Sequence, residues 1–180
     1  MRYNQIRECD IANGEGIGVA LFVQGCHFKC KNCFNPETWD FNGGKEWTPE
    51  VEDKFIELAS RPYIKRISLL GGECLADENL DGVLNLVNRI HLLLPEKTIW
   101  LYTGYTWEEI MKYEYGNHYI NNFNVDALRQ AIITQCDVLV DGRYIESQRD
   151  TTLQWRGSSN QLVINIQKSL EQNEVVLWTT

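Results

Sequence analysis

The sequence lacks several features that would assign it to common classes of protein. It has no block rich in lysine or arginine and a net charge of −8. Nucleic-acid binding usually requires a basic patch that neutralises phosphates, so we expect no nucleic-acid partner. No apolar run approaches the length that crosses a bilayer, and residues 1–8 contain no apolar segment of the kind found in signal peptides. We therefore expect no membrane partner and a cytoplasmic protein.

Internal repeats, low-complexity tracts and linkers are also missing from the sequence. Its 180 residues are enough to bury one proper core. Hydrophobic residues make up 43% of the chain and charged residues 23%, which is ordinary for a globular domain. We therefore predict one domain that spans residues 1–180.

Cysteine, by contrast, is concentrated in one short stretch. Cys26, Cys30 and Cys33 follow the spacing Cys-X3-Cys-X2-Cys directly after an apolar run. In a cytoplasmic protein such a group is more often a metal site than a set of disulfides. Four-iron clusters ordinarily take four cysteine ligands, and structural zinc sites are closed by four ligands, so three thiols suggest one free metal position. A zinc site remains an alternative, with a fourth ligand from His27, Cys9, Cys74 or Cys136.

Apolar runs and amphipathic stretches alternate along the chain. The run 19–23 is typical of a strand that is covered on both faces, as in a parallel sheet. The segment 113–124 is rich in asparagine and predicts a loop insertion. The other predicted elements are a first strand and turn within 1–18, strands at 67–70, 98–102, 138–140, 162–166 and 175–178, and helices that begin at 48–50 and cover 80–90, 107–111 and 125–133.

Unusual residues follow four of the predicted strands. They are Gly25 with the cysteines, residues 71–73 (Gly-Gly-Glu), residues 103–104 (Thr-Gly) and residues 141–142 (Asp-Gly). In barrels and open α/β folds, the C-terminal edge of the strands is where ligands bind. A closed eight-stranded barrel typically needs about 250 residues. We therefore predict an incomplete, open parallel β/α barrel with its site at this edge.

The cysteine loop, with Phe28 before the second cysteine and Phe34 after the third, resembles that of the radical S-adenosylmethionine (SAM) enzymes. The resemblance implies a fold of that type, an open parallel β/α barrel. It also implies one [4Fe-4S] cluster per chain, with the fourth iron chelated by the amino and carboxylate groups of SAM. The cluster ligands would be Cys26, Cys30 and Cys33.

The Gly-Gly-Glu segment adds to the resemblance, because in that family it contacts the methionyl amino group of SAM. Two glycines allow the backbone to approach a ligand closely. Loop structure and core packing are alternative roles for Asn32 and Phe34, and we expect Glu73 to hold the loop rather than to act as an acid or base. Cys74 stands where the family more commonly has proline, and it could be an alternative ligand or a buried thiol. The implied SAM contacts are Asn32, Cys33, Phe34, Gly72 and Glu73.

Segments 100–105, 138–142 and 155–161 extend the resemblance to one group within that family, the activating proteins of anaerobic ribonucleoside-triphosphate reductases. The implied activity is reductive cleavage of SAM and formation of a glycyl radical on the reductase, with an electron donor such as flavodoxin. Asp141 and Arg156 are weaker candidates for polar groups at the substrate mouth, with a strand-end turn and a surface ion pair as alternatives. Two other functions stay open: a small radical SAM enzyme acting on a small molecule, such as a carboxy-deazaguanine synthase, and a non-catalytic zinc-binding module.

Overall fold

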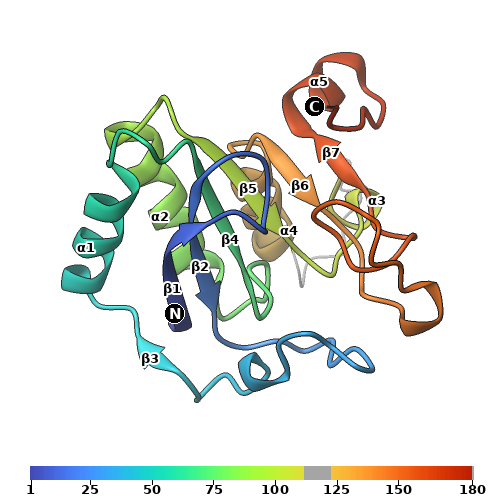
Figure 1. Ribbon diagram of the computed structural model, residues 1–180, viewed down its shortest axis with the longest axis horizontal. Coiled ribbons are helices and arrows are strands. Elements are labelled where there is room, and N and C mark those ends of the chain that lie inside the picture. Colours follow the sequence, from blue (N-terminus) through green and yellow to red (C-terminus); the bar gives the residue numbers. More distant parts are fainter. Residues whose placement is uncertain (112–122, 180) are drawn as a thin grey trace.

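The computed structural model describes residues 1–111 and 123–179. They form a mixed α/β fold around a seven-stranded sheet with the order β3-β1-β2-β4-β5-β6-β7 (Figure 1). The four central strands are parallel: β2 (Gly18–Val23), β4 (Arg66–Gly71), β5 (Thr98–Tyr102) and β6 (Val138–Val140). The antiparallel strands are β1 (Arg2–Asp10), β3 (Lys45–Glu46) and β7 (Val163–Asn165).

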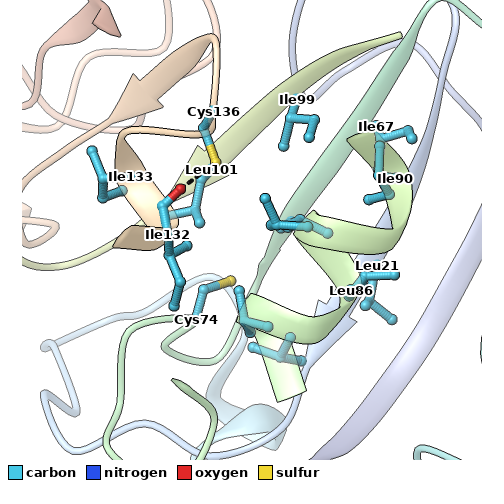
Figure 2. Close-up of a cluster of buried hydrophobic side chains, with 14 of the residues drawn as sticks. Leu21, Ile67, Cys74, Leu86, Ile90, Ile99, Leu101, Ile132, Ile133 and Cys136 are labelled. Carbon is cyan, nitrogen blue, oxygen red and sulfur yellow. Dashed lines mark hydrogen bonds between the residues drawn. The ribbon is translucent and has the colours of Figure 1, made fainter. Parts of the chain in front are cut away.

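Helices cover one face of this sheet. They are α1 (Pro49–Ala59), α2 (Leu80–Leu93), α3 (Trp107–Met111), α4 (Phe123–Ile133) and α5 (Ile166–Gln172), with short 3-10 turns η1 (Pro36–Thr38) and η2 (Glu146–Gln148). Their apolar side chains pack on alternate strand residues such as Leu21, Ile67 and Leu101, and Figure 2 shows part of this core. None of the helices in residues 1–111 and 123–179 is both long and apolar enough to cross a membrane.

The opposite face of the sheet is covered differently. Its buried side chains form two smaller clusters around Trp100 and Phe22, joined by partly buried Tyr102. Trp155 and Trp178, which belong to loops, pack edge-on against Trp100. Within the described residues no helix contributes to these clusters, and the strand order runs from β3 to β7 without closing. The sheet is therefore open, with helices on one side only.

The predicted central strands are confirmed, and the two predicted late strands need correction. Only Val163–Asn165 of segment 162–166 is a strand, because Asn165 caps α5 by accepting a hydrogen bond from the N–H of Lys168 at 3.0 Å. Segment 175–178 makes a single isolated bridge, between Leu177 and Ile164. Its Val176 N–H donates to Ser169 of α5 at 2.9 Å. The chain end is thus divided between β7 and a short helix that no sequence pattern had indicated.

The helix starts match the sequence closely. Thr48 accepts a hydrogen bond from the N–H of Val51 at 3.4 Å, and Pro49 takes the first position of α1. α4 begins at Phe123, two residues before its predicted start at Val125. The rest of the predicted insertion 113–124 lies outside the described residues.

A buried ion pair fixes the loop between β1 and β2. Arg66 is fully buried and lies 3.1 Å from the carboxylate of Asp10. Its guanidinium also donates to the carbonyl oxygens of Asn13 at 2.5 Å and Glu15 at 3.2 Å. Gly14 leaves room for it, since a Cβ there would lie 2.5 Å from the Arg66 side chain. This network binds the β1–β2 loop to the first residue of β4, at the end of the sheet where the parallel strands begin.

We predict that Arg66→Ala lowers the free energy of unfolding by about 3–5 kcal/mol, because it removes the buried cation of the pair and leaves the Asp10 carboxylate with hydrogen bonds from Asn13 and the partly exposed Arg7 at 3.8 Å. Urea denaturation under anaerobic conditions measures the change. Arg89→Ala is the matched control: Arg89 pairs with Glu52 at 2.9 Å but its side chain is 32% exposed, so the loss should not exceed about 1 kcal/mol. Equal losses in the two variants would contradict the prediction.

Candidate functional site

Four loops meet at the C-terminal edge of the parallel strands, as the sequence predicts. The loops after β2 and β4 are joined backbone to backbone. The N–H of Gly72 donates to the carbonyl of Val23 at 2.9 Å, and the N–H of Glu73 donates to that of Gly25 at 2.7 Å. The N–H of Thr103 after β5 binds the end of β6 in the same way. The special residues of the sequence are therefore gathered in one place.

The cysteine loop is shaped by the two residues that precede it. Gly25 has a φ of 97°, and a Cβ there would lie 2.1 Å from the ring of Phe41. The side-chain amide of buried Gln24 donates to the carbonyls of Glu37 at 3.0 Å and Asp40 at 2.7 Å. These contacts bind the start of the loop to the segment that follows it.

Phe28 anchors the middle of the cysteine loop to the neighbouring loops. Its ring centroid lies 4.9 Å from that of Tyr105, edge to face. The guanidinium carbon of Arg143 lies 4.5 Å from the same centroid. Gly104 makes room, because a Cβ there would come within 2.4 Å of the Phe28 ring. Phe28 thus joins the cysteine loop to the loops that follow β5 and β6.

The three thiols of the loop are half-buried and free. Burial raises the pKa of Cys26 and Cys30 above that of an ordinary thiol. Backbone N–H groups act in the opposite direction on these two pKa values, among them that of Tyr144 at Cys30. The N–H of Asn35 donates to the sulfur of Cys33 at 3.4 Å. Amide groups directed at sulfur atoms are the surroundings that a cluster-bound thiolate uses, so the donor set fits an iron–sulfur cluster.

A zinc site fits these residues less well. In the part of the chain that the structure describes, no three His, Cys, Asp or Glu side chains converge on one point as a single metal ion requires. Each thiolate of a four-iron cluster instead binds a separate iron. Of the candidate fourth ligands, His27 pairs with Glu78 at 3.0 Å, and Cys9 lies on β1 near the opposite edge of the sheet. Cys74 and Cys136 are completely buried in the main core (Figure 2).

Glu73 holds the site together through its carboxylate. One oxygen accepts hydrogen bonds from the Thr103 hydroxyl at 2.6 Å and the N–H of Leu75 at 2.8 Å. The other oxygen accepts from the N–H of Gly104 at 2.7 Å. Burial raises its pKa, while these donors and the charge of Arg129 oppose the rise. The expectation that Glu73 holds the loop is confirmed, and its carboxylate joins the loops after β4 and β5.

The other residues expected to contact SAM differ in their exposure to solvent. Asn32 is exposed and has a φ of 57°. Phe34 is 92% exposed, so the interpretation that it packs in the core is wrong. Gly72 is required by the fold itself, since a Cβ there would lie 2.4 Å from the carbonyl oxygen of Gly25.

Asp141 and Arg156, the weaker candidates for the substrate mouth, are both hydrogen-bonded within the protein. Asp141 is 3% exposed and accepts hydrogen bonds from the N–H groups of Trp107 at 2.9 Å and Leu162 at 2.8 Å. This is the strand-end role named as its alternative. Arg156 donates to the carbonyl of Gln161. The segment 155–161 is therefore folded back on itself by its own polar groups.

Two buried amide side chains, those of Gln24 and Asn79, also take part in the site. No pattern in the sequence pointed to them. Gln24 lies between the end of β2 and Gly25. Asn79 directly precedes α2, and its side chain makes no capping hydrogen bond with that helix. Its side chain instead donates to the carbonyls of Gln24 at 3.0 Å and Glu73 at 2.9 Å.

The chain is similar over most of its length to proteins of known name. A protein of Vibrio cholerae is 41% identical over 165 residues, which cover 91% of this chain and 97% of the relative. A protein of Escherichia coli K12 is 38% identical over the same coverage, and one of bacteriophage T4 is 36% identical over 89% of this chain and 92% of the relative. Each is named anaerobic ribonucleoside-triphosphate reductase-activating protein.

The chain belongs to this family. Residues 12–164 also match the family described as a 4Fe-4S single cluster domain. That match includes all three cysteines of the loop and the Gly-Gly-Glu segment. The resemblance stated from the sequence is thereby confirmed, and the match to a 4Fe-4S domain supports an iron–sulfur cluster in this chain.

The Gly72 contact gives a prediction on stability. Gly72→Ala should lower the free energy of unfolding by about 1–3 kcal/mol, because backbone atoms of the cysteine loop must move. Gly82→Ala on α2 is the control, since the three atoms nearest to its Cβ, at 2.8–3.1 Å, belong to the side chain of Met1 at the start of the chain. That change should cost less than Gly72→Ala, because Met1 can move more easily than the backbone of the cysteine loop and alanine favours a helix by up to about 1 kcal/mol over glycine. Urea denaturation compares the two variants, and a Gly72→Ala midpoint equal to that of the unsubstituted protein would contradict the prediction.

Proposed function

We propose that this chain is a radical SAM activase that generates a glycyl radical on an anaerobic ribonucleoside-triphosphate reductase. The observation that carries the proposal is the loop with three free, half-buried thiols at the C-terminal edge of a parallel sheet, in a chain of the activating-protein family. We propose Cys26, Cys30 and Cys33 as the ligands of one [4Fe-4S] cluster. The match to a 4Fe-4S domain supports this assignment over zinc.

When bound, the cluster would supply one electron to SAM, with the loss of methionine and formation of a 5′-deoxyadenosyl radical that removes hydrogen from a glycine of the reductase. The part of the chain is to bind and orient the reacting groups. With three thiols as its ligands, the cluster would keep one iron free for the amino and carboxylate groups of SAM. We propose that SAM contacts Asn32, Cys33 and Phe34 on one side and the Gly72–Glu73 backbone on the other.

The exposure of Asn32 and Phe34 supports such a role, because neither side chain is committed to the core. Glu73 differs from them, since its carboxylate is already bound by three protein donors. We therefore propose that Glu73 contributes through its backbone and by holding Thr103 and Gly104. In this arrangement the Gly-Gly-Glu segment lies directly against the start of the cysteine loop.

Three further proposals follow for the whole chain. The open sheet with helices on one face is the incomplete barrel of a radical SAM enzyme, in one domain over residues 1–180. Six free cysteines fit a reducing compartment, and we place the protein in the cytoplasm. An electron donor such as flavodoxin would reduce the cluster.

The proposed function is tested by mixing reduced protein, SAM and the matching anaerobic reductase. We expect a glycyl radical signal on the reductase in electron paramagnetic resonance (EPR) spectra, with methionine and 5′-deoxyadenosine as products. A reductase in which the radical-site glycine is replaced by alanine should give no such signal. Absence of the radical, under conditions in which a small metabolite drives rapid SAM cleavage, would instead establish the small-molecule function.

The ligand assignment makes a separate prediction. Replacing Cys26, Cys30 or Cys33 singly by alanine should abolish the cluster, because two thiolates cannot hold it with one iron left free for SAM. Replacing Cys9, Cys74 or Cys136 should leave the cluster intact. Iron and sulfide content of anaerobically purified protein gives the answer, and loss of iron in the Cys74→Ala variant would show that the ligand set is wrong.

A further inference from the structure

Asn79 occupies an unusual position between two loops. It immediately precedes α2, where an asparagine side chain ordinarily accepts a hydrogen bond from the first turn of the helix. Here it makes no such bond. Its side chain is 2% exposed, and its amide nitrogen lies 3.0 Å from the carbonyl oxygen of Gln24 and 2.9 Å from that of Glu73. α2 therefore has no side-chain cap from Asn79. The amide instead joins the chain at Gln24 to the chain at Glu73, two segments that are far apart in the sequence.

The two hydrogen bonds use the full donor capacity of the side chain. A primary amide carries two N–H groups, so each carbonyl can receive one. The carbonyl of Glu73 also accepts from the N–H of Ala76 at 3.2 Å. An ionised aspartate of the same shape has no donor, and leucine fills a similar volume without one. Only a short amide side chain can satisfy both carbonyls from this position.

The bridged carbonyls lie at the starts of the two functional segments. Gln24 directly precedes Gly25 and Cys26, and Glu73 directly follows Gly72. Beyond the β2–β4 ladder, two backbone hydrogen bonds join the segments, from the N–H of Gly72 to the carbonyl of Val23 and from the N–H of Glu73 to that of Gly25. The amide of Asn79 adds two further hydrogen bonds between the same segments, one to the carbonyl of Gln24 and one to that of Glu73. Its loss would leave a buried carbonyl on the cysteine loop without the donor that the structure provides.

We propose that Asn79 is a positioning residue that sets the cysteine loop against the segment that binds SAM. This role rests on the proposed function, because it concerns the distance between the cluster and the SAM contacts at Gly72. Both hydrogen bonds of the Asn79 amide go to backbone carbonyls and not to the thiols of the loop. Asn79 acts through the carbonyls of Gln24 and Glu73, and its loss should loosen the junction while the cluster ligands remain in place.

The test uses the full chain, purified anaerobically with its cluster, as the variants Asn79→Leu and Asn79→Asp. Both should retain iron and sulfide. SAM should bind about tenfold more weakly, as expected when a buried hydrogen bond is lost, and its effect on the EPR spectrum of the reduced cluster should require correspondingly more SAM. Hydrogen exchange at the amides of Gly72 and Glu73 should be faster by about the same factor, without SAM present.

Thr48→Val is the control for a loss of stability elsewhere, because Thr48 accepts a hydrogen bond from the N–H of Val51 at the start of α1. This variant should lose stability, while SAM affinity and exchange at Gly72 and Glu73 stay within about twofold of the unsubstituted protein. The aspartate variant keeps the test valid if the leucine variant does not fold. Faster exchange spread evenly over the whole chain, or unchanged SAM affinity in both variants, would overturn the role of Asn79. Failure of the unsubstituted protein to bind SAM would overturn the proposed function, and with it this role.

Discussion

The parallel pairing of β2 with β4 is the constraint on which the site depends. The register is continuous, from Gly18 opposite Arg66 to Val23 opposite Gly71. Both strands therefore end at the same level, and the cysteine loop and the glycine segment leave the sheet side by side. A shift by one residue would turn every side chain to the other face. The Arg66 network at the first pair of this register resists such a shift.

The two ends of these strands have different tasks. At the end where they begin, the buried charge of Arg66 is satisfied by Asp10 and by backbone carbonyls. At the end where they finish, glycines replace side chains, and the loops are held by single polar groups such as the carboxylate of Glu73. Glycine at position 72 is needed for the close contact with the Gly25 backbone, whether or not a ligand also approaches it.

The central fold could be predicted from the sequence because its signals are local. An unbroken apolar run such as 19–23 indicates a buried strand, and Thr48 with Pro49 indicates a helix start. The chain end could not be predicted in this way. Whether segment 175–178 continues as a strand depends on Ser169 of α5, which takes the N–H of Val176. That contact exists only after α5 has packed against the sheet.

For the site, as for the fold, the sequence indicated the local motifs and not the contacts between distant segments. The spacing of the cysteines and the Gly-Gly-Glu segment are visible as patterns. The roles of Gln24 and Asn79 are not, because their partners are backbone carbonyls, which every residue possesses. Phe34 shows the converse: an aromatic residue next to a cysteine suggests packing, yet its side chain is exposed.

The unequal burial of the six thiols has a practical consequence for handling the protein in air. Cys74 and Cys136 are sealed in the core and cannot meet an alkylating reagent while the chain is folded. Cys9 is exposed and would react in any state, whereas the three loop thiols would react only when the proposed cluster does not cover them. If the proposed ligands are right, counting the labelled thiols would thus distinguish folded protein that has kept a cluster from folded protein that has lost it to oxygen.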